Sequence, residues 1–328
     1  MSFAAMPGTQ TMINMYQKMT LIKQTNERIR DLTRAGKFAF THHSSRGQEV
    51  IPSAISVHLS DDDYICTIYR GIHDMLAKGL PSRLLWAELA GRKTGACKGK
   101  GGPMHIAYPA KGIMVTTAIV GASMLIANGL ALAAQIRKEQ RVTIAYFGDG
   151  ASNIGGFHEA LNLASVWKLP VIFVCQNNGY SEHSRSSKMT SVPNISQRAS
   201  SYQIPGITVD GNNPFAVWSV AKDAIERARS GLGPTLIEAR TFRFFGHTLP
   251  DEDQYMHQGE KLWAMAHDPV PAFRKWLVDS SNSTESQLSK IESDTSMEID
   301  EAVEFAISSP FPEVDELDMD VYQYEAGE

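Results

Sequence analysis

The chain has 328 residues, of which 43% are hydrophobic and 20% charged, as in ordinary soluble globular proteins. Its net charge of −5 is uneven: residues 279–328 hold fifteen acidic residues and one lysine, net −14, which leaves +9 for the rest. A basic body suits an anionic cofactor or substrate, and no Lys/Arg cluster with interleaved aromatic residues suggests a nucleic-acid partner.

The cysteines favour a reduced environment. Cys66, Cys97 and Cys175 show neither a pairing pattern nor metal-binding spacing, and Cys175 falls within a predicted buried strand. A reduced, cytoplasmic setting is therefore expected. The N-terminus has no basic region followed by an apolar one, so the sequence predicts no signal peptide.

The first part of the chain reads as alternating helix and strand. The patterns predict a helix over Met12–Ala35, a turn and short strand over Asp61–Ile68, a helix over Ser82–Ala90 and a glycine-rich loop over Gly91–Gly102. Tyr69-Arg70 closes the short strand. An arginine at such a strand end is well suited to bidentate contact with phosphate oxygens.

One uncharged stretch, Gly112 to Ile136, is long enough to cross a bilayer. Polar residues interrupt it, however, and small residues recur along its second half. The pattern therefore predicts a buried helix over Gly121–Arg137 that packs tightly against protein, with a subunit contact as one setting, and no membrane span.

The central segment predicts a βαβ unit. An apolar run, Val142 to Phe147, precedes Gly148-Asp149-Gly150, and a second, Val171 to Cys175, leads to Asn177-Asn178. Between them, apolar residues at helical spacing predict a crossover helix. Strands joined in this way are parallel and end at the same edge of the sheet. Asp149 and Asn178 should therefore lie side by side although they are 29 positions apart.

That sheet edge should bind a metal and a diphosphate. Asp149, Asn178 and the carbonyl of Tyr180 offer only oxygen ligands, which suit Mg²⁺. Glycine on either side of Asp149 permits close approach of a phosphate, and the following helix should offer free N–H groups. A dinucleotide-binding fingerprint is excluded because Asn153 stands where glycine is required, and no Gly-Lys-Ser/Thr P-loop occurs.

The C-terminal half continues the alternation. It reads as an exposed serine-rich loop over Glu182–Ser201, a strand over Ile207–Asp210, a helix from Asn213-Pro214 to Arg229, a strand over Thr235–Phe242, a long polar loop over Gly246–Gly259 that is mobile or ordered by a partner, and a helix over Ser286–Ile307. The predicted architecture is a doubly wound, mostly parallel α/β sheet flanked by helices in one domain, residues 1–310, followed by an acidic tail, residues 311–328.

The GDG and NN pair resembles the thiamine-diphosphate motif, and the resemblance extends from about Gln10 to Pro271. The segments THHSSRGQE (41–49), YRG (69–71), GKGGPMH (99–105), IVG (119–121) and RTFRFFGH (240–247) are similar to the α subunit of heterotetrameric 2-oxoacid and acetoin dehydrogenases. The resemblance implies the diphosphate-binding half of a thiamine-diphosphate fold, with thiamine diphosphate and Mg²⁺ as cofactors.

Carried onto this sequence, the resemblance assigns a role to each motif. The implied cofactor-binding residues are Tyr69, Arg70, Ala118, Val120, Asp149, Gly150, Ala151, Asn178, Arg243 and His247, with Asp149, Asn178 and Tyr180 on the metal. Ala118 stands where the family usually has glycine. The implied active-site histidines are His43, His247 and His105, whereas His42 and His73 remain without a role. An imidazole of near-neutral pKa suits proton donation to a developing alkoxide or assistance to acyl transfer.

One group that the chemistry needs is missing from these motifs. In the family, the glutamate that activates the aminopyrimidine belongs to the β subunit, so the resemblance implies an α₂β₂ heterotetramer in which this chain alone is almost inert. It implies cleavage of a pyruvate-like 2-oxoacid or of acetoin, followed by transfer of the acyl group to a lipoyl acyltransferase. Two alternatives stay open: a two-chain enzyme of non-oxidative acyloin or ketol transfer without a lipoyl partner, and a non-catalytic regulatory or assembly subunit. The intact motif argues against the last.

Overall fold

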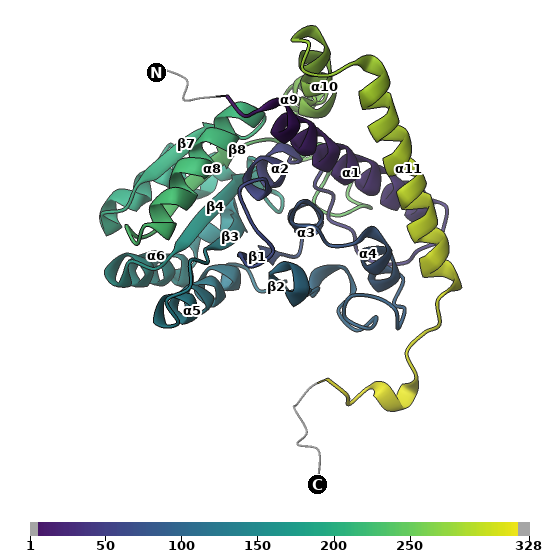
Figure 1. Ribbon diagram of the computed structural model, residues 1–328, viewed down its shortest axis with the longest axis horizontal. Coiled ribbons are helices and arrows are strands. Elements are labelled where there is room, and N and C mark those ends of the chain that lie inside the picture. Colours follow the sequence, from purple (N-terminus) through teal and green to yellow (C-terminus); the bar gives the residue numbers. More distant parts are fainter. Residues whose placement is uncertain (1–5, 321–328) are drawn as a thin grey trace.

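The computed structural model describes residues 6–320, and its centre is a six-stranded sheet (Figure 1). The strand order is β2-β1-β3-β4-β8-β7, and every neighbouring pair is parallel. The strands are β1 (Tyr64–Ile68), β2 (Ile113–Thr117), β3 (Thr143–Gly148), β4 (Val171–Asn177), β7 (Gly206–Asp210) and β8 (Thr235–Arg240). The doubly wound, parallel α/β class predicted from the sequence is confirmed.

Helices cover both faces of the sheet. One face packs against α5 (Ala122–Ile136) and α6 (Gly155–Trp167); the other packs against α2 (Val50–Ser56), α3 (Ile72–Lys78) and α8 (Pro214–Arg229). Successive residues of β3 divide between two separate cores, Ile144 and Tyr146 in one, Ala145 and Phe147 in the other. Because side chains alternate along a strand, burial on both sides accounts for the nearly unbroken apolar runs of β3 and β4.

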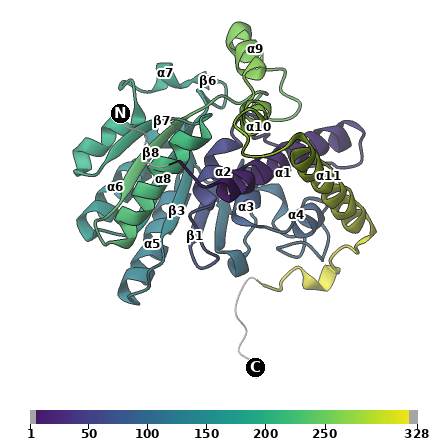
Figure 2. The ribbon, with the colours of Figure 1, turned by 45° about the horizontal axis from the view of Figure 1, so that its top comes forward.

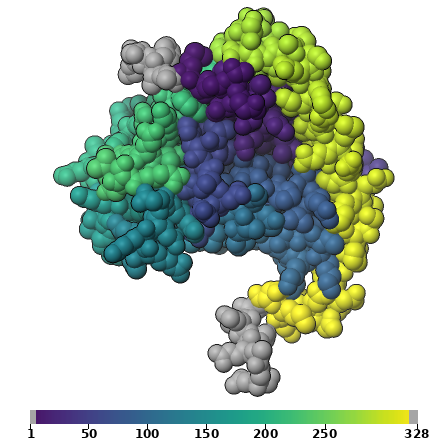
Figure 3. Space-filling model, viewed as in Figure 1, coloured from purple at the N-terminus to yellow at the C-terminus, as the bar shows by residue number. Residues whose placement is uncertain are grey.

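Further helices form an outer layer beyond α2 and α3. The long helices α1 (Thr9–Arg34) and α11 (Glu285–Ser308) pack together, and α4 (Ser82–Leu89) and α10 (Pro269–Asp279) contact them. Figure 3 shows α11, in yellow, running along the outside of this layer. By contrast, α9 (Gln258–Ala266) projects from the body (Figure 2), and its Leu262 and Trp263 are exposed.

Several element predictions need correction. The uncharged stretch contains a strand, β2, before its helix, and α5 is only half-buried, with Leu125, Ile126 and Ile136 exposed. The serine-rich segment predicted as an exposed loop is partly ordered and partly buried. It forms a hairpin of β5 (Tyr180–Ser181) and β6 (Ser184–Arg185), then α7 (Ser186–Met189) and the 3₁₀ helix η4 (Ile195–Tyr202). Within residues 6–320, no helix is both long and apolar enough to cross a membrane.

The acidic segment after α11 lies against the glycine-rich loop. Lys93 pairs with Glu316, and both Lys98 and Lys100 pair with Asp320, while Arg92 stacks on Phe311 at 3.7 Å. This segment includes the short 3₁₀ helix η5 (Val314–Glu316). Opposite charges thus meet at this surface. The predicted residues 321–328 of the tail lie outside the described part.

Candidate active site

A cavity of about 440 Å³ opens where the strands of the sheet end. Tyr69 and Arg70 follow β1, Asp149 follows β3, and Asn178 follows β4, while Arg243 lies shortly after β8. Its lining contains all the predicted cofactor, metal and catalytic positions except His105: His43, Tyr69, Arg70, Ala118, Val120, Asp149, Gly150, Ala151, Asn178, Tyr180, Arg243 and His247. The parallel strands therefore gather distant residues at one edge.

Asp149 presents a buried carboxylate that lacks a cationic partner. The side chain is 3% exposed and accepts hydrogen bonds from the hydroxyls of Ser181, at 3.0 Å, and Ser186. In the described part of the chain no lysine or arginine forms an ion pair with it. Burial raises the pKa of Asp149, because a carboxylate loses hydration in the interior. A cation bound beside it would reverse that effect.

The backbone after β3 differs from the predicted arrangement. A 3₁₀ turn, η3 (Asp149–Asn153), follows the strand, and α6 begins only at Gly155. The amides nearest the cavity therefore belong to Gly150 and Ala151 of this turn rather than to the first turn of the α-helix. A Cβ atom on Gly150 would lie 2.7 Å from the Ser181 hydroxyl, so glycine keeps this approach open.

Two buried arginines line the same cavity, and within residues 6–320 neither forms an ion pair with an acidic residue. Arg70 is 3% exposed and donates to the carbonyl of Ser44 at 2.7 Å and, more weakly, to His247. Arg243 is 1% exposed and donates to the Glu182 carbonyl and to the Tyr255 hydroxyl. Burial, with Arg243 next in importance, lowers the pKa of Arg70 to about 10. Cations in such a setting favour binding of an anion.

The aromatic wall of the cavity contains two neutral imidazoles. The His43 ring lies 4.6 Å from that of Tyr69 and 5.0 Å from that of His247. Burial and the neighbouring Arg70 lower the pKa of His43 to about 3 and that of His247 to about 4. These pKa values lie well below the near-neutral range expected from the sequence, so both rings are uncharged at neutral pH. Each ring can accept a proton at one nitrogen and donate a hydrogen bond from the other.

His105, the third predicted histidine, lies elsewhere. It is exposed and does not contribute to the cavity lining, whereas its neighbour Met104 does. The glycine-rich motif thus brings Met104 to the cavity but leaves the adjacent His105 outside its lining. Within the described residues, the location of His105 does not support the catalytic role predicted for it.

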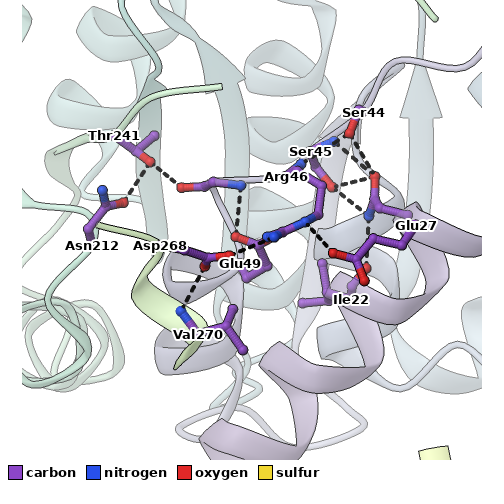
Figure 4. A network of polar contacts seen from close by, with 12 residues as sticks. Ile22, Glu27, Ser44, Ser45, Arg46, Glu49, Asn212, Thr241, Asp268 and Val270 are labelled. Carbon is purple, nitrogen blue, oxygen red and sulfur yellow. Dashed lines mark hydrogen bonds and ion pairs between the residues drawn. The ribbon is translucent and has the colours of Figure 1, made fainter. Parts of the chain in front are cut away.

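The segment that contains His43 is held by a polar network (Figure 4). Asn26 of α1 accepts from the Ser45 amide at 3.0 Å, and Arg46 pairs with Glu27, Glu49 and Asp268. Asp268 also caps α10 by accepting from the Val270 amide. One buried guanidinium thus ties α1, the segment 42–49 and α10 together, which fixes the backbone on which His43 and the Ser44 carbonyl are displayed.

The mouth of the cavity is apolar. Ala118 and Val120 line it, and Ile119 and Val120 are 69% and 48% exposed. Gly121 closes this turn with φ of 82°, a conformation that favours glycine, and a Cβ there would meet Ile154. Exposed aliphatic side chains beside a polar cavity suit either a ring of a ligand or another subunit.

The lining residues that were not predicted include Gln48 and Gln176. Both are buried, and their amides hydrogen-bond to each other at 2.8 Å. Gln48 belongs to the THHSSRGQE motif and Gln176 lies two positions before Asn178, so proximity to the motifs was the available signal. Their contact joins residues 128 positions apart, which no local pattern reports.

The arrangement suits a hard cation together with an anion. No group of three or more His, Cys, Asp and Glu side chains that could hold a metal occurs within residues 6–320. A single carboxylate with amide and carbonyl oxygens is instead the kind of partial ligand set that Mg²⁺ completes with phosphate oxygens and water. Asp149 needs positive charge and the two arginines need negative charge, and a metal–diphosphate supplies both.

Comparison with known proteins gives a consistent family match. The model of the family described as "Dehydrogenase E1 component" matches residues 16–315. The α subunit of the acetoin:2,6-dichlorophenolindophenol oxidoreductase of Bacillus subtilis is 41% identical, covering 95% of this chain and 94% of that protein. Its counterpart from Cupriavidus necator is 39% identical, covering 97% of this chain and 96% of that protein. The pyruvate dehydrogenase E1 component subunit alpha of Porphyra purpurea is 37% identical, covering 92% of this chain and 90% of that protein.

Proposed function

Since this chain belongs to the dehydrogenase E1 component family, as the α subunit of a thiamine-diphosphate-dependent oxidoreductase, we propose that its cavity binds thiamine diphosphate and Mg²⁺. With a β subunit, it cleaves acetoin or a pyruvate-like 2-oxoacid and passes the acyl group to a lipoyl acyltransferase. The observation that supports this most is that one cavity brings together a buried carboxylate and two buried guanidiniums, none of which forms an ion pair within residues 6–320.

The cavity residues fit the cofactor by charge and by shape. Asp149, Asn178 and the Tyr180 carbonyl would hold the metal, and Arg70 and Arg243 would hold phosphate oxygens. The amides of Gly150 and Ala151 would complete the diphosphate site, and Ala118 and Val120 would contact the rings. Burial of all four charged or amide side chains excludes water, which strengthens each of these contacts.

When bound, the cofactor supplies a nucleophilic carbon and an electron sink for cleavage of the bond next to the carbonyl. His43 and His247, neutral at physiological pH, are placed to donate a hydrogen bond to a developing oxyanion or to receive a proton from the acyl acceptor. In the described part of the chain, Asp149 and Glu182 are the acidic residues of the cavity lining, and Asp149 would hold the metal. Activation of the aminopyrimidine needs a further acidic group. We assign that acidic group to the β subunit, which would also cover the exposed Ile119 and Val120.

The substrate is the less constrained part of the proposal. Relatives named for acetoin and for pyruvate both match along nearly the whole chain. Acetoin and pyruvate share a carbonyl beside the bond that breaks, so the same site residues serve either. The β subunit would complete the pocket that separates them.

Calorimetry on the complex of this chain with its β partner tests the proposal. Thiamine diphosphate is expected to bind only when Mg²⁺ is present, and the absence of metal-dependent binding would refute the proposal. In the same preparation, reduction of an artificial electron acceptor with acetoin and with pyruvate identifies the substrate. Acyloin release in place of lipoyl-dependent transfer would favour the non-oxidative alternative.

A further inference from the structure

A line of four buried side chains runs from the cavity into the core. Asn178 donates from its amide nitrogen to Gln48 Oε1 at 3.0 Å, and Gln48 Nε2 donates to Gln176 Oε1 at 2.8 Å. Gln176 Nε2 then donates to Asp74 Oδ1 at 2.7 Å. All four residues are 6% exposed or less, so water does not compete for these bonds. They come from four separate places in the sequence: α3, the segment before α2, β4 and the turn after it.

One backbone group sets the direction of the whole line. The Tyr180 amide lies 3.2 Å from Asn178 Oδ1, and because an N–H can only donate, the atom that faces it must be oxygen. The Asn178 nitrogen must then face Gln48, whose side-chain oxygen must accept the hydrogen bond. Gln48 in turn presents nitrogen to Gln176, and Gln176 presents nitrogen to Asp74. Reversing any one amide would oppose two donors or two acceptors in a dry interior, at the cost of unsatisfied buried groups.

The far end of the line consists of Asp74 and His73, both at most 1% exposed. Asp74 also accepts from the Thr67 hydroxyl at 2.5 Å. The two ring nitrogens of His73 face two acceptors, the Arg70 carbonyl at 3.1 Å and Gln176 Oε1 at 2.5 Å. Asp74 Oδ1 lies 3.4 Å from His73 Nε2, so this ring nitrogen faces both Gln176 and Asp74.

We propose that Asn178, Gln48 and Gln176, anchored by His73 and Asp74, form a directed amide relay that holds the Asn178 oxygen towards the metal site. This deepens the proposed function and rests on it, since it takes Asn178 as a metal ligand. The carbonyl oxygen has two lone pairs, one of which accepts from Tyr180, which leaves the other for a cation. Gln48, Gln176, His73 and Asp74 are positioning residues, which act on the metal through Asn178.

The test is the Mg²⁺ dependence of the αβ complex in which Gln48 is replaced. Gln48→Met has nearly the same length but can neither accept from Asn178 nor donate to Gln176, so the Asn178 amide is free to rotate. Loss of such a supporting contact typically weakens metal binding by about 10–100-fold. We expect the Mg²⁺ concentration for half-maximal activity, at fixed thiamine diphosphate, to rise by this factor, while kcat at saturating Mg²⁺ stays within about threefold.

A matched control separates this effect from general damage. Gln24→Met makes the same chemical change in α1, where the amide donates to the Glu292 carbonyl away from the cavity, and it should leave the Mg²⁺ requirement unchanged. Gln176→Met interrupts the relay one step further from the metal and should give a smaller rise. If Gln48→Met does not assemble, Gln176→Met decides the question by the same measurement.

The outcomes for the two proposals are distinguishable. If the unmodified complex binds thiamine diphosphate without Mg²⁺, the proposed function fails. If the unmodified complex needs Mg²⁺ but Gln48→Met and Gln176→Met need no more of it, or lose kcat alone, the relay is refuted and the proposed function stands.

Discussion

Replacing each of two buried arginines by methionine should have opposite effects on stability. Arg70 is 3% exposed and Arg46 is 6% exposed, but Arg46 pairs with three carboxylates and Arg70 with none. Removing one partner of a buried ion pair typically costs about 3–5 kcal/mol, because the remaining charge is left unpaired. Arg46→Met should therefore strongly destabilise the protein, because the buried Glu49 would lose its cationic partner.

The expected effect of Arg70→Met follows from its pKa. The fold lowers that pKa well below its usual value, to about 10, so the charged form is less stable in the fold than in the unfolded chain. This cost is fully present at every pH below about 10, and at 1.36 kcal/mol per pKa unit it is roughly 3 kcal/mol. Methionine removes it but leaves the Ser44 carbonyl without its donor, which costs about 1–2 kcal/mol. The net gain is on the order of 1–2 kcal/mol.

Scanning calorimetry of the cofactor-free complex measures both variants. Arg70→Met should raise the unfolding temperature by about 2–4 °C. It should also abolish the further rise that thiamine diphosphate and Mg²⁺ produce, which is about 2.7 kcal/mol at a hundredfold excess over Kd. Destabilisation by Arg70→Met equal to that by Arg46→Met would show that Arg70 serves the fold rather than an anion.

Three further predictions concern the cavity and its surroundings. Asp149→Ala should remove Mg²⁺-dependent binding of thiamine diphosphate by calorimetry while leaving the unfolding temperature of the cofactor-free complex unchanged or higher; persistence of activity would contradict the metal assignment. His42, 1% exposed and with both ring nitrogens lacking a partner in the described chain, has its pKa lowered by burial from 6.5 to about 3, so stability should be lost as pH falls below 6.5, by roughly 3 kcal/mol at pH 4. His42→Leu should make the unfolding temperature less sensitive to acid over that range, and an unchanged acid profile would argue against this source. His247→Ala should slow acyl transfer to a lipoyl acceptor by about 10²–10⁴-fold and affect the artificial-acceptor reaction less; equal losses in the two assays would refute the acyl-transfer role.

Local patterns predicted the elements that position the site. The βαβ unit was predictable because β3 and β4 are buried on both faces and α6 has a clear helical period. Its strand directions then placed Asp149 and Asn178 in one cavity. The strand β2 was missed because its uncharged residues continue without a break into those of α5. The 3₁₀ turn η3 was missed because no residue between Asp149 and Gly155 forbids a regular helix.

Side-chain direction was less predictable than strand direction. His105 lies in a motif that reaches the site, yet it is exposed. This could not be predicted, because a loop without a hydrophobic period does not reveal which way its side chains face. Gln48 and Gln176 depend on contacts between segments far apart in sequence. The buried Arg46 network likewise joins Glu27 to Asp268, across most of the chain.

The orientation of the Asn178 amide begins at the main chain of Tyr180. Every amino acid except proline supplies that N–H, so a change of the Tyr180 side chain would keep the backbone donor that orients Asn178, even though the buried ring itself packs against Phe242 and Tyr255. Proline, which has no backbone N–H, is the one replacement that would remove this hydrogen-bond donor. Natural variants of this enzyme should therefore exclude proline at this position.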